Sequence, residues 1–104
     1  MGALARSTDP ETSQLAAELL DAEHIRKSQA AVLRVLGSIG PSSDHGLIEA
    51  YGQLAADGIV RPQSPSGIRT RRKELTVRGR VLDTGHRERT PSGRQAIVWA
   101  VAAR

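Results

Sequence analysis

The chain has 104 residues, enough for one domain with a small core. It holds one Trp, one Tyr and no Phe, so Leu, Ile, Val and Ala must supply that core; without Cys it has no disulfide scaffold and no thiolate metal site. No apolar run is long enough to span a bilayer, and the first ten residues lack the basic-then-apolar order of a secretion signal. We therefore expect a cytoplasmic protein without a membrane partner.

Charge is unevenly distributed along the chain. Residues 1–60 hold four Lys or Arg and eight Asp or Glu, whereas residues 61–94 hold ten Lys or Arg and three Asp or Glu. An acidic front half and a basic back half suggest that one face of the protein meets a polyanion. The alternative is a solvated basic surface. We favour the polyanion because the basic residues fall within one predicted helix and one predicted hairpin.

The N-terminal part of the chain divides into two segments. Residues 1–10 show no periodicity and are predicted to be a disordered N-terminus. Residues 11–27 form a predicted helix, in which Leu15, Leu19 and Leu20 share one face and the basic residues come last, as the helix dipole prefers. This helix either packs on the rest of the domain or pairs with its twin in a homodimer, and the sequence leaves both open.

Residues 28–104 form the main predicted domain. Its first helix begins with Ser28 as the cap and continues to Ile39, where Gly and Pro follow. The second helix is predicted over 44–56, after a Ser-Ser-Asp capping sequence and before an Asp-Gly terminator. Both helices carry apolar residues at helical spacing.

A third helix is predicted to begin at Ser64 or Ser66 and to run to about Arg78. A serine oxygen can accept hydrogen bonds from the free amides of a first helical turn, and Pro65 fits the first helical position if Ser64 is the cap. Gly79 is placed to terminate the helix.

This third helix combines one thin apolar stripe with dense positive charge. Ile68 and Leu75 are two helical turns apart and share one face. Four of the five residues from Arg69 to Lys73 are cationic. Such a helix suits a phosphate-lined groove, and we interpret it as the recognition helix of a winged helix-turn-helix.

A β-hairpin is predicted to follow. Its strands are expected over 80–84 and 95–102, with a polar loop over 85–93 that contains Arg87 and Arg89. The predicted fold class is therefore mainly α with a C-terminal β-hairpin, and the hairpin would be the wing of a winged helix-turn-helix.

The order of three helices and a hairpin with a basic tip is that of the winged-helix fold. The spacing of Ile68, Leu75 and the sequence Gly79-Arg80-Val81 resembles the recognition helix and first wing strand of the multiple-antibiotic-resistance regulator superfamily. More closely, the stretch 63–72 with the Arg-rich turn that follows resembles small winged-helix proteins encoded by actinobacterial phages. The resemblance covers about residues 28–102. It implies DNA binding, a phage or prophage origin and the cytoplasm of a bacterial host.

Two features depart from the larger superfamily. Arg72 stands four residues after Ile68, where the superfamily usually has an aliphatic core residue. Its stem can pack while its head reaches solvent or phosphate. The superfamily's regulators also carry long dimerisation helices on both sides of the DNA-binding lobe, whereas here only residues 11–27 are available.

The resemblance implies how the DNA-binding residues would act. The first turns of the recognition helix would enter the major groove, where Gly67 allows close approach and Arg69 can bond guanine through two hydrogen bonds. Ser and Thr hydroxyls and the remaining helix cations would contact phosphates, and the arginines of the wing would reach the adjacent minor groove. The predicted DNA-binding residues are Ser64, Ser66, Gly67, Arg69, Thr70, Arg71, Arg72, Lys73, Arg87, Arg89 and Arg94.

Residues for catalysis are not evident in the sequence. His24, His45 and His86 stand apart without metal-ligand spacing, and no phosphate loop or nucleophile elbow is present. Trp99 lies on an alternating strand and is expected in the core rather than on a stacking surface. We expect no enzyme activity and no cofactor.

The sequence thus predicts a sequence-specific binder of double-stranded DNA, either a transcriptional regulator of phage type or a recombination factor. The alternative function is a winged-helix interaction module that docks on a host, replication or recombination protein through its acidic N-terminal helix or its wing. Steep salt dependence distinguishes DNA binding from the alternative.

Overall fold

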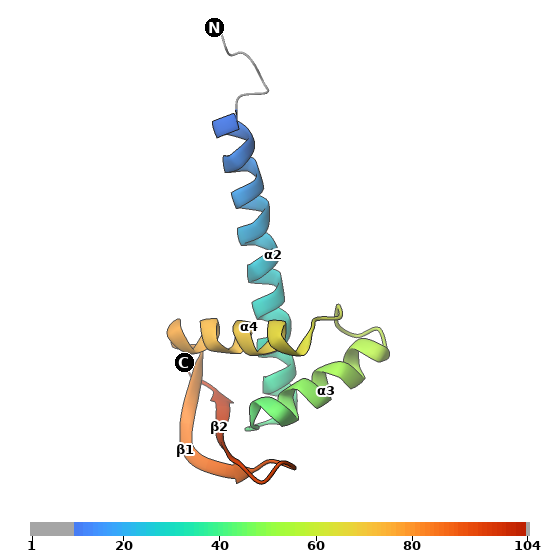
Figure 1. Ribbon diagram of the computed structural model, residues 1–104, viewed down its shortest axis with the longest axis vertical. Coiled ribbons are helices and arrows are strands. Elements are labelled where there is room, and N and C mark those ends of the chain that lie inside the picture. Colours follow the sequence, from blue (N-terminus) through green and yellow to red (C-terminus); the bar gives the residue numbers. More distant parts are fainter. Residues whose placement is uncertain (1–9, 104) are drawn as a thin grey trace, which may run out of the picture.

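The computed structural model describes residues 10–103. In this part of the chain three helices precede one antiparallel hairpin (Figure 1). The mainly helical fold with a C-terminal hairpin is therefore confirmed; most of the predicted N-terminal tail lies outside the described residues. The elements are α2 (Pro10–Ile39), α3 (Asp44–Ala56), α4 (Pro65–Val77), β1 (Val81–Arg89) and β2 (Gln95–Val101).

Helix α2 corrects one prediction. The sequence predicted two helices that meet at Ser28, but α2 continues through this position for 30 residues. Ser28 does not cap a helix; its carbonyl oxygen instead accepts a hydrogen bond from the Gln63 side chain. Serine costs a helix interior only a few tenths of a kcal/mol relative to Ala, and no Pro or Gly stands nearby to break the helix. A serine alone was therefore too weak a signal to predict the start of a new helix.

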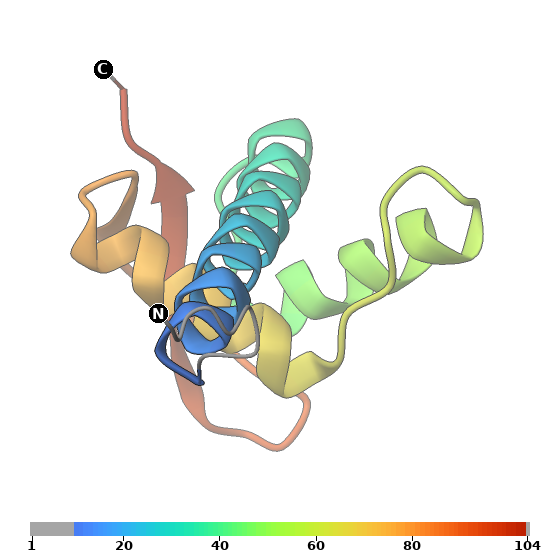
Figure 2. The same cartoon turned by 90° about the horizontal axis from the view of Figure 1, so that it is seen from above.

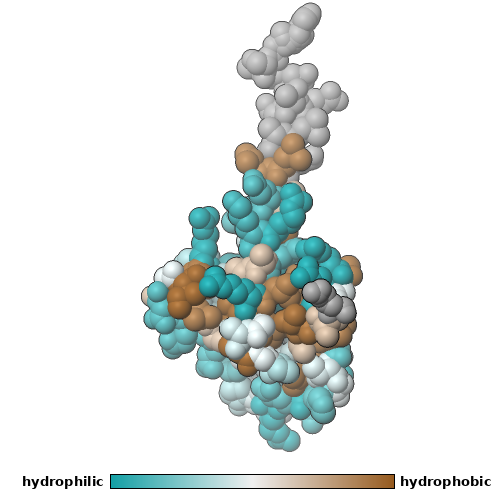
Figure 3. All heavy atoms as spheres, turned by 180° about the vertical axis from the view of Figure 1, so that it is seen from behind, coloured by the Kyte–Doolittle hydropathy of each residue, from teal (hydrophilic) through white to brown (hydrophobic). Residues whose placement is uncertain are grey.

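The C-terminal half of α2 lies at the centre of the fold. Figure 2, which looks along α2 from above, shows α3, α4 and the hairpin arranged around it. The N-terminal half extends beyond this body, so that the described structure measures 61 × 29 × 28 Å (Figure 1). Leu19 and Leu20 lie on the extension and are 68% and 67% exposed. Hydrophobic side chains are visible on this part of α2 in Figure 3.

The core forms where α2, α3, α4 and β1 meet. Helix α4 buries Ile68 and Leu75, as their seven-residue spacing predicted, and Trp99 packs against the edge of the core. Tyr51 is fully buried, and its hydroxyl donates a hydrogen bond to the Arg61 carbonyl at 2.6 Å. The buried hydrophobic residues are Val32, Val35, Leu36, Leu47, Tyr51, Val60, Ile68, Leu75 and Val81.

Serine side chains begin both short helices, as predicted. Ser43 Oγ accepts from the Gly46 amide at the start of α3, and Ser64 Oγ accepts from the Gly67 amide at 3.0 Å at the start of α4. Pro65 occupies the first turn of α4, where a missing N–H costs nothing. At the other end, Gly79 has a φ of +75°, a conformation that favours glycine after a helix.

The hairpin is longer than predicted. The sequence placed a loop over 85–93, but β1 continues to Arg89, and its pairing with β2 is interrupted only by an irregularity between Asp83 and Arg87. Gly85 suggested a loop, and its φ of +86° is instead accommodated within this irregularity. The strand prediction ended too early because a single glycine does not distinguish a bulge from a turn.

Backbone pairing attaches the hairpin to the helices. Ser42 lies between α2 and α3, and it exchanges two hydrogen bonds with Trp99 of β2, at 2.9 and 2.8 Å. The side chain of Ser43 donates to a Glu88 carboxylate oxygen on β1 at 3.1 Å. These contacts fix the hairpin beside the first turn of α3. None of the described helices combines the length and apolar character that crossing a membrane requires.

Candidate nucleic-acid interface

One face of α4 is open to solvent along its whole length. Its exposed residues are Ser66, Arg69, Thr70, Lys73 and Val77, which we call the α4 stripe. Their spacings of three and four residues place them on one side of the helix, opposite the buried pair Ile68 and Leu75. The stripe therefore presents two cations, two hydroxyls and one apolar side chain in a row.

Arg72, a predicted DNA-binding residue, lies beside the stripe and is turned into the protein. Its Nε and Nη2 each donate to a different carboxylate oxygen of Asp44 at 2.8 Å, and its guanidinium stacks 3.9 Å from the centre of the Trp99 ring. Its side chain is only 13% exposed. The side chain of Arg72 thus joins α4 to α3 and β2 through its contacts with Asp44 and Trp99.

Arg71 lies on the other flank of α4 and pairs with Glu74. Its Nη2 donates to Glu74 Oε2 at 2.9 Å, while its Nε lies 2.8 Å from Glu74 Oε1 without alignment for a hydrogen bond. Glu74 also accepts from the buried Gln29 of α2 at 2.9 Å, and Gln29 accepts from Arg78. This chain of contacts joins α4 to α2 and balances the charge of Arg71.

The first turn of α4 contains two further predicted residues, Ser64 and Gly67. They face each other as cap and capped amide, 3.0 Å apart. A Cβ at Gly67 would lie 3.0 Å from Ser64 Oγ, so the absence of a side chain there preserves the cap. In this structure Gly67 is half-buried on the flank toward α2 rather than within the stripe.

The hairpin tip comes close to the stripe. A groove of about 400 Å³ is lined by Arg69 of α4, His45 of α3 and Arg94 at the tip, together with polar and small tip residues. Among the described residues that line this groove there is no carboxylate. The tip and the start of α4 lie on the same side of the molecule in Figure 2. We call this space the tip groove.

The other two hairpin arginines, Arg87 and Arg89, differ in whether a carboxylate pairs with them. Arg87 donates to Asp83 Oδ1 at 3.2 Å and to the His86 carbonyl at 2.9 Å. The Gly85 amide, followed by the charge of Arg87, lowers the pKa of Asp83 below its usual value, although desolvation opposes the shift. Arg89 is exposed and forms no ion pair within the described part of the chain.

Alternation along β1 separates the charges of the hairpin. Successive side chains on a strand point to opposite faces, so Arg87 and Arg89 face away from Glu88, which is held by Ser43. The acidic side chain of this segment is therefore turned toward the body, and the two arginines remain on the other face.

The predicted DNA-binding residues thus fall into two groups in the structure. Six residues are exposed on the stripe or hairpin and form no ion pair within the described chain: Ser66, Arg69, Thr70, Lys73, Arg89 and Arg94. The other five hold the local structure together: Ser64, Gly67, Arg71, Arg72 and Arg87.

Sequence reasoning missed Val77 and His45. Val77 is 82% exposed at the end of the stripe, four residues after Lys73 and seven after Thr70, a spacing that could have identified it. His45 follows the Asp44 that binds Arg72, and only the docking of α3 against the hairpin brings it to the tip groove.

Residues for metal binding do not come together in the described part of the chain, where no group of three His, Cys, Asp or Glu side chains could hold an ion. No known protein family, curated protein or solved structure matches the chain.

Proposed function

We propose that this protein binds duplex DNA as a winged helix, with α4 in the major groove and the hairpin as the wing. The observation that carries the proposal is the tip groove, which joins Arg69 of the α4 stripe to Arg94 of the hairpin tip. Two exposed basic elements that share one groove form a continuous cationic surface. Such a surface fits the regularly spaced phosphates of a duplex.

The α4 stripe has the side chains needed for base recognition. Arg69 and Lys73 can each donate to guanine, and Arg can do so through two parallel hydrogen bonds. Thr70 and Val77 offer methyl groups to thymine. The half-exposed or buried residues on the rest of α4 hold the helix in place, so the stripe is presented rigidly. A helix of this length can contact only a few base pairs, so each copy of the protein would recognise a short sequence.

The hairpin would supply backbone contacts. Arg94 and Arg89 are the free cations of this element, and arginine is favoured in narrow A·T minor grooves. Arg71 and Arg72, which we first expected at phosphates, would act as supports for α4 because carboxylates already neutralise them. Arg87 would be a weaker contact than Arg89 because Asp83 pairs with it.

A second copy of the chain would complete the site. A single α4 stripe reads too little sequence for selective binding, and dimers read two half-sites. The extended part of α2 carries exposed Leu19 and Leu20, whose burial requires another surface. A homodimer through α2 of a phage-type transcriptional regulator or recombination factor is therefore the biological form that we propose.

Nuclear magnetic resonance of the ¹⁵N-labelled chain with a mixed-sequence duplex tests the location of the interface. We expect the largest amide shifts at residues 66–77 and 90–96, with small shifts at Arg34 and Gly37 of α2, which belong neither to the α4 stripe nor to the tip groove. Shifts confined to the extended part of α2, or absent altogether, would favour the alternative of a protein-interaction module.

A further inference from the structure

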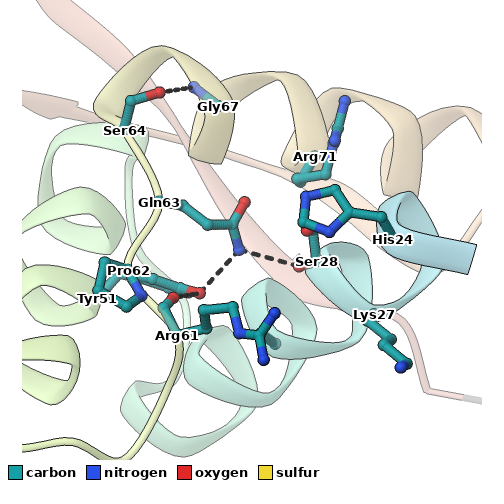
Figure 4. A pocket seen from close by; sticks show the side chains of 11 residues that line it. His24, Lys27, Ser28, Tyr51, Arg61, Pro62, Gln63, Ser64, Gly67 and Arg71 are labelled. Atoms are coloured by element: carbon teal, nitrogen blue, oxygen red, sulfur yellow. Dashed lines mark hydrogen bonds between the residues drawn. The ribbon is translucent and has the colours of Figure 1, made fainter. Parts of the chain in front are cut away.

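A second cleft lies on the flank of α4, between α2 and the connector from α3 (Figure 4). Its volume is about 390 Å³, which falls within the range of about 300–1,000 Å³ typical of small-molecule sites. Gln63 stands in its centre, and we call it the Gln63 cleft. None of the described cationic residues of the α4 stripe lines it, so it is separate from the surface proposed to read DNA bases.

Hydrogen bonds hold the floor of the Gln63 cleft in place. Gln63 Nε2 donates to the Tyr51 hydroxyl at 2.7 Å and to the Ser28 carbonyl at 3.3 Å, as the dashed lines in Figure 4 show. The Tyr51 hydroxyl donates in turn to the Arg61 carbonyl. Because these polar groups form hydrogen bonds with one another, the floor of the cleft is held in place without a ligand. The side chains of its walls therefore determine what the cleft binds.

The walls are cationic. Lys27 comes from α2, Arg61 from the connector and Arg71 from α4, and no Asp or Glu is found among the described residues that line the cleft. Glu74 balances Arg71 from outside the cleft. Arg61 forms no ion pair within residues 10–103.

Lys27 is only weakly neutralised. Its Nζ lies 4.0 Å from Glu23, and both side chains are mostly exposed, at 75% and 58%. An exposed pair at this distance contributes little. The cleft therefore presents the positive charge of Lys27, which is only weakly neutralised, and that of Arg61, which has no ion pair within residues 10–103.

We propose that the Gln63 cleft binds a phosphate group. Two cations that line the same cleft match a phosphate monoester, which carries close to two negative charges and three acceptor oxygens. Arg adds planar N–H donors suited to phosphate, and Lys adds a mobile point charge. The phosphate comes from a free molecule of nucleotide size or from the backbone of DNA held on α4, and the experiment separates these two sources.

Occupancy by a free anion has a consequence for DNA binding. Gly67 and Arg71 line the cleft, one residue away from Ser66 and Thr70 of the α4 stripe. A negative charge placed there would repel the duplex, so we expect the occupied protein to bind DNA several-fold more weakly. This consequence rests on the proposed function, whereas binding of the anion does not.

Titration of the ¹⁵N-labelled protein with AMP, without DNA, tests the proposal directly. The side-chain amide of Gln63 is the reporter because it lies in the centre of the cleft. We expect saturable shifts of this signal with AMP, much smaller shifts with adenosine, and at least five-fold weaker AMP binding in Lys27→Ala. Lys27 is exposed, so the variant should fold normally. Arg34→Ala is the matched control, because Arg34 is an exposed cation of α2 outside the cleft.

The remaining outcomes identify the source of the phosphate or overturn the proposal. If AMP has no effect but a duplex shifts the Gln63 signal in a Lys27-dependent way, the cleft binds a backbone phosphate. Equal responses to AMP and adenosine, equal losses in Lys27→Ala and Arg34→Ala, or an unchanged Gln63 signal with both AMP and duplex would overturn it. Because the AMP titration uses no DNA, its result stands whether or not the protein binds DNA.

Discussion

Arg72 of α4 and Asp44 of α3 form a bidentate ion pair with two contacts of 2.8 Å, and Trp99 of β2 lies beneath the guanidinium. Three elements thus meet at one side chain. The pair is mostly buried, with 13% and 21% of the two side chains exposed. This geometry explains how an arginine occupies a position at which an aliphatic residue was expected: its stem packs, and its charge is neutralised internally.

Replacement of Arg72 should therefore destabilise the fold. Arg72→Ala leaves Asp44 without its partner and removes the contact with Trp99, and we expect a loss of about 1–3 kcal/mol in the free energy of unfolding. Arg72→Lys should also be destabilising because an ammonium group cannot form the bidentate contact. Urea unfolding monitored by Trp99 fluorescence measures both. The control is Arg69→Ala, an exposed substitution on the same helix that should change stability by about 0.5 kcal/mol or less. Equal stability of all three variants would show that the pair contributes nothing.

Two exposed arginines should differ in what they contribute to DNA binding. Arg69 is placed on the α4 stripe, so Arg69→Ala should reduce discrimination at one base pair by about 1–3 kcal/mol. Arg89 lies on the hairpin, so Arg89→Ala should weaken binding to all sequences alike. Selection of binding sites from a random duplex library measures the preference of each variant. The site assignment would be wrong if both variants kept the wild-type affinity and preference.

The exposed leucines of α2 should control assembly. Leu19→Glu together with Leu20→Glu places charge on the extension without touching the core, because both side chains are more than half exposed. We expect the wild-type protein to be a dimer at micromolar concentration and the double variant to be a monomer of unchanged helicity. Light scattering after gel filtration gives the masses, and circular dichroism gives the helicity. A wild-type monomer would contradict the dimer proposal.

The irregular part of the hairpin should respond to acid. The Gly85 amide and Arg87 lower the pKa of Asp83 in the folded state, so the stabilisation exists above the ordinary value of the carboxyl group and disappears as the pH falls through the lowered value. We expect the Gly85 amide signal to move in this acidic range. In Asp83→Asn the acid transition should be absent. A Gly85 signal with no transition below the ordinary value of the carboxyl group, or the same acid transition in Asp83→Asn, would contradict this assignment.

Local sequence signals predicted much of this fold because they act over a few residues. The serine cap and proline at the start of α4, the buried pair Ile68 and Leu75 and the terminal Gly79 all follow from contacts within one helix. The continuity of α2 and the length of β1 were predicted wrongly, since Ser28 and Gly85 are compatible with either outcome and packing decides.

The candidate site was less accessible to sequence reasoning than the fold. A run of cations on α4 does not reveal that Arg72 is paired, because its partner comes from a distant part of the chain. The pair of Arg71 with Glu74, three residues apart on one helix, could have been predicted from the sequence. Asp44 is 28 residues from Arg72 in the sequence. The Gln63 cleft likewise forms only where three elements meet, and no short sequence motif predicts it.

DNA binding is tested most directly by the affinity for a mixed-sequence duplex, measured by fluorescence anisotropy from 50 to 200 mM salt. The four free cations of the interface are Arg69, Lys73, Arg89 and Arg94. The hairpin cations Arg89 and Arg94 are assigned to phosphates, so log Kd should rise with log salt with a slope of at least about 2 per protein copy, and Arg89→Ala with Arg94→Ala should remove about 2 of it. No binding at 50 mM salt, or binding that salt leaves unchanged, would contradict a DNA-binding function and direct the search to a protein partner.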